Sequence, residues 1–455
     1  MIKKFIMALT AFVMSINIVS AKHIPSVIDK VFLDTDISKS AVGISIQNID
    51  KPRKFYELNY EKPMMPASSQ KLITTIPSIK ILGENYKFST KLYKEKNKQE
   101  YYLVLGADPY LTTRELKLLL SNIKLPKDKN ISKIYIDDSI FDKTEWGEGW
   151  QWDDDLNPLI PKYSAYNIDG NLIKITFTPL NNQPPQVETN VFYPIVFMNY
   201  VKNGNKNDIK LSRKNYISSN EITLDGEILS KTSVNVPINN MELYFKLRIK
   251  DSLKANKLHY YDDFTFKKLP TKNIELIGEI THPIDKAIFD IYENSNNLVA
   301  ETVFKLAGAK YSNSKGSFEH SYQIIEDFCS ANVVDLSTVR IVDGSGVSKN
   351  NLLTPKFMTD YLVQLVNNYG YDEVSKMLAS PNNEYGTLKN RMLFLQNNLH
   401  AKTGTLFDVS SISGFIETRK GNKYAFSIII NDAKSTKIQK KSFEEVLLRE
   451  IYRNL

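Results

Sequence analysis

Alternating and periodic apolar positions divide the N-terminal part of the chain into two strands and a helix. Residues 41–47 and 54–58 alternate between apolar and polar side chains in the manner of strands. Residues 68–82 then follow a helical pattern that ends at Gly83. Pro77 lies inside this run, so we expect it to kink or shorten the helix.

The rest of the pattern separates a strand-rich middle from a mixed C-terminal region. Short strand-like runs occupy residues 87–266, and a helical period returns from about residue 283. Two strand-like runs and a final helix follow, at residues 409–417, 423–430 and 442–453. We therefore expect an α+β fold in which residues 22–86 and 281–455 form one domain and residues 87–280 form a β-rich insertion.

The first 21 residues have the pattern of an export signal. Lys3 and Lys4 precede an apolar run from Phe5 to Val19, and the small residues up to Ala21 suit a cleavage site. The run is short for a transmembrane span, so a retained anchor is the weaker interpretation. We expect cleavage near Ala21 and a mature protein outside the cytoplasm.

The composition is that of a soluble globular protein, with 42% hydrophobic and 24% charged residues. The single cysteine, Cys329, excludes an intramolecular disulfide and a cysteine-rich zinc site. The net charge of +8 suits an anionic partner, although the basic residues are spread along the chain as on an ordinary basic surface. Because export argues against nucleic acid, peripheral association with a cell wall or a membrane stays open.

The first candidate for chemistry is Ser68-Ser-Gln-Lys71. A serine and a lysine three residues apart share one helix face, so the amine can reach the hydroxyl. Serine becomes a good nucleophile only when a base takes its proton, and lysine can do this if burial lowers its pKa. The spacing alone is weak evidence, because it recurs at residues 121–124 and 312–315.

Two further motifs follow in order along the chain. Ser295-Asn-Asn297 precedes a helix and, taken alone, Ser295 or Asn297 suits the N-cap before Leu298. Lys402-Thr-Gly404 precedes a pair of strands, where lysine and hydroxyl groups can bind a substrate carboxylate. Serine-x-x-lysine, serine-x-asparagine and lysine-threonine-glycine in this order are typical of penicillin-recognising serine enzymes.

The wider text of these motifs narrows the family. The matching segments are Pro-Ala-Ser-Ser-Gln-Lys at 66–71, Ser-Asn-Asn-Leu-Val-Ala-Glu at 295–301, Asp-Gly-Ser-Gly at 343–346 and Ala-Lys-Thr-Gly-Thr at 401–405. With them the chain resembles the D-alanyl-D-alanine carboxypeptidases/endopeptidases of the type-4, class C low-molecular-mass penicillin-binding proteins. The resemblance implies a serine β-lactamase/DD-peptidase-like domain, with a subdomain nested in the insertion at about 184–236.

The resemblance also implies a role for each motif residue. Ser68 is expected to attack the penultimate D-alanine and form an acyl-enzyme, with Lys71 as its base. Lys402 is expected to help keep that amine neutral. Ser295 is expected to relay a proton to the leaving amine, and Asn297 to bind the substrate amide or Lys71.

Substrate binding is expected at the third motif. The resemblance implies that Thr403 and Thr405 hold the terminal carboxylate beside Gly404, and that Asp154 contacts a diaminopimelate amine. The implied partners are peptidoglycan stem peptides in the bacterial periplasm, with β-lactams as covalent inhibitors. No cofactor or metal is expected.

Other features favour structural roles. Asp343–Gly346 suits a tight loop. Trp146, Trp150 and Trp152 favour core packing, with stacking on sugar as the alternative. Asp153–Asp155 lacks calcium-loop spacing and suits a solvated acidic loop.

Three alternatives stay open at this point. The same fold can serve as a catalytically silent wall-binding scaffold, although the intact motifs argue against it. A β-lactamase is disfavoured, because the gap between Ser68 and Ser295 is much longer than in those enzymes. The motifs do not separate carboxypeptidase from endopeptidase activity.

Overall fold

The computed structural model describes residues 26–51, 54–127, 129–213 and 220–455. The export segment at residues 1–21 lies outside these described residues, so cleavage near Ala21 stays a prediction. Among the helices of the described ranges, none is long and apolar enough to cross a membrane.

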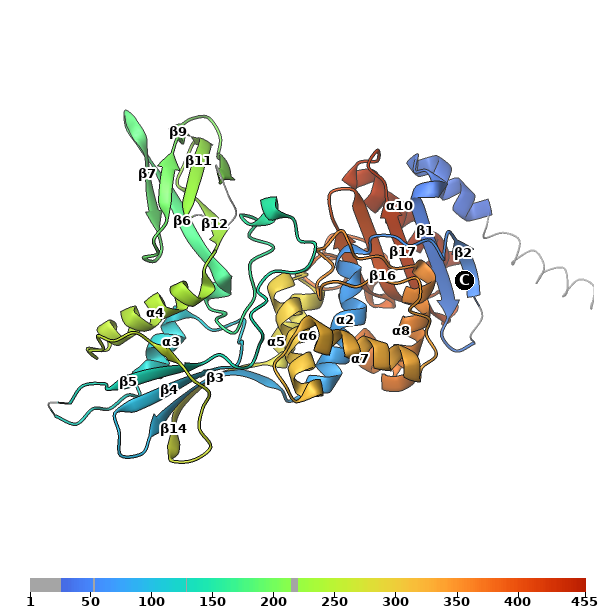
Figure 1. The fold of residues 1–455 in the computed structure, drawn as a ribbon. Helices are drawn as coiled ribbons and strands as arrows, with labels where there is room; N and C mark the ends of the chain where they lie inside the picture. Colours follow the sequence, from blue (N-terminus) through green and yellow to red (C-terminus); the bar gives the residue numbers. More distant parts are fainter. Residues whose placement is uncertain (1–25, 52–53, 128, 214–219) are drawn as a thin grey trace, which may run out of the picture.

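The two ends of the chain share one five-stranded sheet (Figure 1), with the order β15-β16-β17-β1-β2. Every neighbouring pair in it is antiparallel. The strands are β1 (Val42–Asn48), β2 (Lys54–Leu58), β15 (Leu399–Thr405), β16 (Val409–Glu417) and β17 (Lys423–Asn431). The predicted α+β fold is confirmed, and β15 forms the edge of the sheet that carries the third motif.

Helices pack against this sheet and against one another around two apolar cores. They are α2 (Lys71–Leu82), α5 (Ile284–Tyr292), α6 (Asn297–Ser312), α7 (Phe318–Ala331), α8 (Pro355–Tyr369) and α10 (Lys437–Asn454). One core joins the sheet to α10 and to a helix at residues 26–35, where the rings of Phe32 and Phe443 lie 4.8 Å apart. The other core surrounds α2 and α6. Every residue of α6 from Leu298 to Ala309 is buried, because α2, α5 and α7 pack around it.

Pro77 lies inside α2 without shortening it. The helix continues to Leu82 and ends at Gly83, whose φ is 92°. Proline lacks the N–H that would bond to the carbonyl of Ile73. The hydroxyl of Tyr361 in α8 donates to that carbonyl instead, at 3.2 Å. The expected shortening is therefore wrong, because a tertiary hydrogen bond satisfies the carbonyl that proline leaves unpaired.

The insertion is built on a second five-stranded sheet, in the order β13-β5-β4-β3-β14. Its strands are β3 (Lys87–Glu95), β4 (Glu100–Leu105), β5 (Lys133–Asp137), β13 (Thr265–Phe266) and β14 (Ile274–Pro283). Two helices, α3 (Thr113–Leu120) and α4 (Met241–Ala255), share its apolar core. Figure 1 shows the insertion to one side of the first sheet, next to α5 and α6.

Two small sheets lie within the insertion, in the orders β12-β6-β7 and β10-β11-β8, with β9 paired to β11. Their strands are β6 (Leu172–Leu180), β7 (Gln183–Thr189), β8 (Val196–Asn199), β9 (Lys202–Asn203), β10 (Asp208–Ser212), β11 (Glu221–Ile228) and β12 (Thr232–Pro237). They share a separate apolar core. Since β6 begins before residue 184, the small sheets extend beyond the expected nested segment. The domain limits themselves stay predictions.

One long segment of the insertion, residues 138–168, packs against the first domain and is called the bridging loop here. It contains no strand and only one short 3-10 turn, η3 (Trp152–Asp154). Its buried side chains form an apolar cluster with residues of the first domain, namely Trp150, Ile160, Tyr163, Leu298 and Val347. The insertion is therefore anchored next to the start of α6, where the second motif lies.

Candidate active site

Ser68 lies in a strained turn at the start of α2. The turn η2 (Ala67–Gln70) is a 3-10 helix that runs directly into α2. Ala67 has a φ of 49°, in the left-handed region that residues with side chains rarely adopt. The hydroxyl of Ser69 donates to the carbonyl of Pro66 at 2.7 Å and helps to close the turn. Local backbone strain of this kind is common at functional sites.

The amine of Lys71 is buried among three oxygen atoms. Its Nζ lies 2.8 Å from Ser68 Oγ, 2.7 Å from Asn297 Oδ1 and 2.8 Å from the carbonyl of Ser345. Of these three groups, only the hydroxyl can donate a hydrogen bond as well as accept one. A neutral amine can therefore donate to Asn297 and Ser345 while it accepts the proton of Ser68.

A second buried lysine, Lys402, anchors the second motif. Its Nζ donates to Ser295 Oγ at 2.8 Å and to the carbonyl of Thr403 at 2.8 Å. The two amines thus each contact one serine hydroxyl at the same site. The structure brings together Ser68, Lys71, Ser295, Asn297 and Lys402 from all three motifs.

Burial shifts both amines toward their neutral forms. It lowers the pKa of Lys71 to about 7, although the carboxylates of Glu301 and Asp343 act in the opposite direction. Burial, together with the positive charge of Lys71, holds the pKa of Lys402 well below its ordinary value. Lysine can accept a proton near neutral pH only when its pKa is lowered in this way.

Ser295 directs its hydroxyl into the site from a strained position. Its φ of 58° lies in the left-handed region. The side chain of Asn296 then accepts a hydrogen bond from the backbone N–H of Val299 at 3.1 Å and caps α6. The cap is therefore Asn296, and the expectation for Ser295 or Asn297 as the cap is wrong. Those two side chains are left for Lys402 and Lys71.

Gly404 lets the edge strand β15 approach the nucleophile. A Cβ at this position would lie 2.8 Å from the backbone nitrogen of Ser68 and 2.4 Å from Ser411 Oγ. Any side chain would push β15 away from the turn that carries Ser68. Its two neighbours in sequence, Thr403 and Thr405, line the same pocket as Ser68.

A second copy of the serine-lysine spacing has no such surroundings. At residues 121–124, Lys124 Nζ donates at 3.0 Å to the backbone carbonyl of Ser121, not to its hydroxyl. Lys124 is exposed and Ser121 is half-buried. The burial around Ser68 and Lys71, rather than the spacing, distinguishes the candidate site.

The Asp343–Gly346 loop supports the site more directly than its sequence indicates. Its Ser345 carbonyl binds Lys71, and the backbone N–H groups of Gly344 and Ser345 donate to the Glu301 carboxylate at 3.0 and 2.7 Å. Burial and the charge of Asp343 raise the pKa of Glu301. The residue types of this loop predict a tight turn but not its contact with the lysine, because a backbone carbonyl leaves no signal in the residue types.

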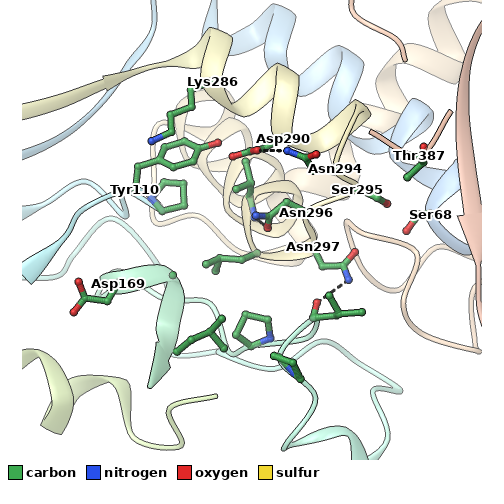
Figure 2. A pocket seen from close by; sticks show the side chains of 18 of the residues that line it. Ser68, Tyr110, Asp169, Lys286, Asp290, Asn294, Ser295, Asn296, Asn297 and Thr387 are labelled. Atoms are coloured by element: carbon green, nitrogen blue, oxygen red, sulfur yellow. Dashed lines mark hydrogen bonds between the residues drawn. The ribbon is translucent and has the colours of Figure 1, made fainter. Parts of the chain in front are cut away.

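The site opens into a pocket of about 610 Å³ between the first domain and the insertion. Figure 2 shows Ser68 and Ser295 at one end and Tyr110 and Lys286 at the other. The bridging loop forms part of the wall, where the carbonyl of Leu159 accepts a hydrogen bond from Asn297 Nδ2 at 2.8 Å. The insertion therefore contributes to the pocket, which the three motifs did not indicate.

The structure does not place Asp154 with the other site residues. It belongs to η3 and is absent from the described residues that line the pocket. Burial and the neighbouring Asp153 raise its pKa. Asp155 pairs with Arg213 at 2.5 Å, so a fully solvated acidic loop is not what forms here.

The tryptophans divide between two environments. Trp150 is buried in the apolar cluster of the bridging loop, and Trp146 packs against it. Trp152, however, is 68% exposed. Core packing is therefore confirmed for Trp150 and wrong for Trp152.

Comparison with known proteins agrees with this arrangement. The model of the D-Ala-D-Ala carboxypeptidase 3 (S13) family matches residues 25–449. The chain belongs to this family. The predicted resemblance to D-alanyl-D-alanine carboxypeptidases is thus confirmed, as is a serine-type carboxypeptidase as the class of enzyme.

The matches to relatives and to solved structures extend over nearly all of this chain. D-alanyl-D-alanine carboxypeptidase DacB of Haemophilus influenzae is 24% identical over 440 residues, which are 91% of each chain. D-alanyl-D-alanine carboxypeptidase of Actinomadura sp. (strain R39) is 23% identical over 434 residues, 89% of this chain and 80% of the relative. The crystal structure of penicillin-binding protein 4 from H. influenzae has a TM-score of 0.80 at 21% identity, covering 94% of this chain and 99% of that one. This likeness shows the shared fold.

Proposed function

We propose that this S13 enzyme is a serine DD-peptidase that acts on peptidoglycan stem peptides through an acyl-enzyme on Ser68. It removes a terminal D-alanine, cuts D-alanine–diaminopimelate cross-links, or does both. The observation that carries the proposal is the 2.8 Å contact between Ser68 Oγ and the buried amine of Lys71. A titrating base beside a serine in a substrate-sized pocket is the arrangement that covalent catalysis requires.

In the proposed acylation, Ser68 Oγ attacks the carbonyl carbon of the penultimate D-alanine while Lys71 takes its proton. Lys71 donates to Asn297 Oδ1 and to the Ser345 carbonyl. These two hydrogen bonds orient the lone pair of the amine toward the serine. The backbone N–H groups of Ser68 and Thr405 stabilise the oxyanion, and loss of one such donor typically costs about 3 kcal/mol.

Ser295 relays the proton that Lys71 has taken from Ser68 to the departing amine, and the peptide bond breaks. Thr403 and Thr405 hold the carboxylate of the leaving D-alanine. Water then hydrolyses the ester and restores Ser68. The proposal assigns no step to a metal or a cofactor.

Penicillin provides the direct test, and a complex of the H. influenzae protein with a β-lactam supports its use. Fluorescent penicillin is expected to label the pure protein covalently and to leave Ser68→Ala unlabelled. Ser121→Ala is the matched control, because Ser121 also lies three residues before a lysine, Lys124, but that lysine is exposed. Labelling that survives in Ser68→Ala would overturn the proposal.

The two peptidase activities differ only in the amine that leaves. Mass spectrometry of cross-linked and uncross-linked muropeptides after digestion separates them. Release of free D-alanine identifies a carboxypeptidase, and monomers from dimers identify an endopeptidase. Binding to wall sacculi without either product would contradict the proposal and favour a silent scaffold.

We also propose that the mature protein acts in the periplasm. The charged and apolar pattern of residues 1–21 supports export, and the substrate lies outside the cytoplasm. A mature N-terminus near Lys22 in the periplasmic fraction is the expected result, and an intact Met1 in the cytoplasm would contradict it.

A further inference from the structure

A second pocket, of about 390 Å³, lies between the bridging loop and residues 237–239 of the insertion. Three tryptophans line it, Trp146, Trp150 and Trp152, and they are the only tryptophans in the chain. The rest of the wall is formed by Asp155, Lys162, Pro237, Ile238 and Asn239. A pocket of this size that is mostly apolar, with a few polar groups, has the usual character of a small-ligand site.

The indole rings form a partly open apolar wall. Trp146 and Trp150 pack edge to face with their centroids 5.0 Å apart. Trp152 adds a ring that is 68% exposed. Its indole offers an apolar face and one N–H donor to a ligand in the pocket.

The charged groups of this pocket are already compensated. Asp155 pairs with Arg213 at 2.5 Å, and Lys162 Nζ donates to the carbonyl of Asn239 at 2.7 Å. Lys162 also lies 3.7 Å from the carboxylate of Glu145. A neutral ligand is therefore favoured over an ion, since an ion would have to break these pairs.

The bridging loop contributes to the walls of both this pocket and the active-site pocket. Pro161 lines the pocket of Ser68, and the next residue, Lys162, lines the tryptophan pocket. Trp150 also donates to Asp343 in the loop that holds Lys71. The second pocket is thus built on the same segment of chain that forms part of the active-site wall.

We propose that the tryptophan pocket binds the glycan strand of the substrate, through a neutral N-acetylated amino sugar. A pyranose ring has an apolar C–H face that stacks on indole and a polar edge of hydroxyl and amide groups. Those polar groups can donate to the Asp155 carboxylate, whose two oxygens can each accept more than one hydrogen bond. The inference rests on the proposed function, because the stem peptide is attached to such a glycan.

Intrinsic fluorescence provides a direct test, because every tryptophan lines the pocket. The probe is N-acetylchitotetraose, an uncharged oligomer of N-acetylglucosamine, with maltotetraose as the control sugar. We expect a saturable change in tryptophan emission with the first sugar and little change with the second. Trp152→Ala is expected to weaken binding about tenfold, still reported by Trp146 and Trp150, while Trp152→Phe retains most of it.

Tyr261→Ala is the matched control, because Tyr261 is an aromatic residue that is 84% exposed and lies outside the described lining of the pocket. Binding in this variant is expected to equal that of the wild type. Absence of a saturable emission change, an equal response to maltotetraose, or unchanged affinity in Trp152→Ala would overturn the proposal. An emission change that depends on protein concentration alone would also overturn it, by showing that a second copy covers the pocket.

Penicillin labelling separates this proposal from the proposed function. The Trp152→Ala variant is expected to be labelled at the wild-type rate, since penicillin carries no glycan. Glycan binding that is lost while labelling persists supports the second site. If penicillin does not label the wild-type protein, the proposed peptidase function is refuted, whatever the tryptophan emission shows.

Discussion

The indole nitrogen of Trp150 donates a hydrogen bond of 2.8 Å to the carboxylate of Asp343. Trp150 belongs to the insertion and Asp343 to the loop that supports Lys71. The same carboxylate accepts bonds from Gln70 Nε2 at 3.1 Å and from the backbone N–H of Gly346 at 2.8 Å. One buried side chain thus connects the insertion, the loop and the residue next to the proposed base.

Replacement of Trp150 by phenylalanine removes one donor from this buried carboxylate. The carboxylate keeps its other donors, and loss of one hydrogen bond to a charged group typically costs about 1.5–3 kcal/mol, so we expect a loss of this size in the free energy of unfolding. Trp146→Phe is the control, because its indole donates to a backbone carbonyl at the longer distance of 3.3 Å. Urea unfolding of both variants measures the difference, and equal losses would show that the contact with Asp343 contributes little.

Acylation by penicillin is expected to depend on the charge of Lys71. With a pKa lowered to about 7, the amine is protonated below that pH and neutral above it. Only the neutral form accepts a proton, so the acylation rate should rise as the pH increases through about 7 and then level off. Stopped-flow measurement from about pH 5 to about pH 9 tests this expectation, because this range extends about two pH units on either side of the lowered pKa.

Lys71→Arg serves as the control for the pH profile, because guanidinium stays charged in proteins. We expect this variant to be acylated slowly at every pH. A wild-type rate that is flat across the range, or that falls as the pH rises, would contradict the role of Lys71 as the base.

Gly346→Ala is expected to damage the site more than an equivalent change elsewhere. Gly346 has a φ of 80°, and a Cβ there would lie 2.1 Å from the carbonyl of Ala67, next to Ser68. Gly421 has a similar φ of 76°, but a Cβ there would have no other atom within 4 Å. Gly421→Ala therefore isolates the cost of the backbone conformation, about 1–2 kcal/mol. Thermal unfolding and acylation rates should both be worse for Gly346→Ala; equal behaviour would exclude a role for the close approach.

A buried ion pair behind β16 gives a prediction on stability alone. Glu444 in α10 is fully buried and contacts Arg391 at 2.7 Å and Ser410 at 2.6 Å. Arg391→Met leaves this carboxylate without its cation and is expected to cost about 3–5 kcal/mol. The double variant Arg391→Met, Glu444→Leu should recover part of that loss in chemical unfolding. A double variant less stable than Arg391→Met would contradict this account.

Much of the fold was predictable because its signals are local. The strand at Lys54–Leu58 and the hairpin strands near the C-terminus follow from alternation and turn residues alone. The edge strand β15 and the complete burial of α6 did not follow, because both depend on which elements pack around them. Pro77 shows the same limit, since the bond from Tyr361 that replaces the missing one comes from a distant helix.

The sequence by itself determined the chemistry available to this protein. A serine and a lysine three residues apart in a helical segment define a nucleophile and an amine that can reach each other, because side chains at that spacing lie on the same face. Only the tertiary structure decided that this amine is buried, that Lys402 holds Ser295, and that Asp154 is not among the described residues that line the pocket. The physical reason is that desolvation and charge coupling depend on every group packed around an atom, and those groups come from segments far apart along the chain.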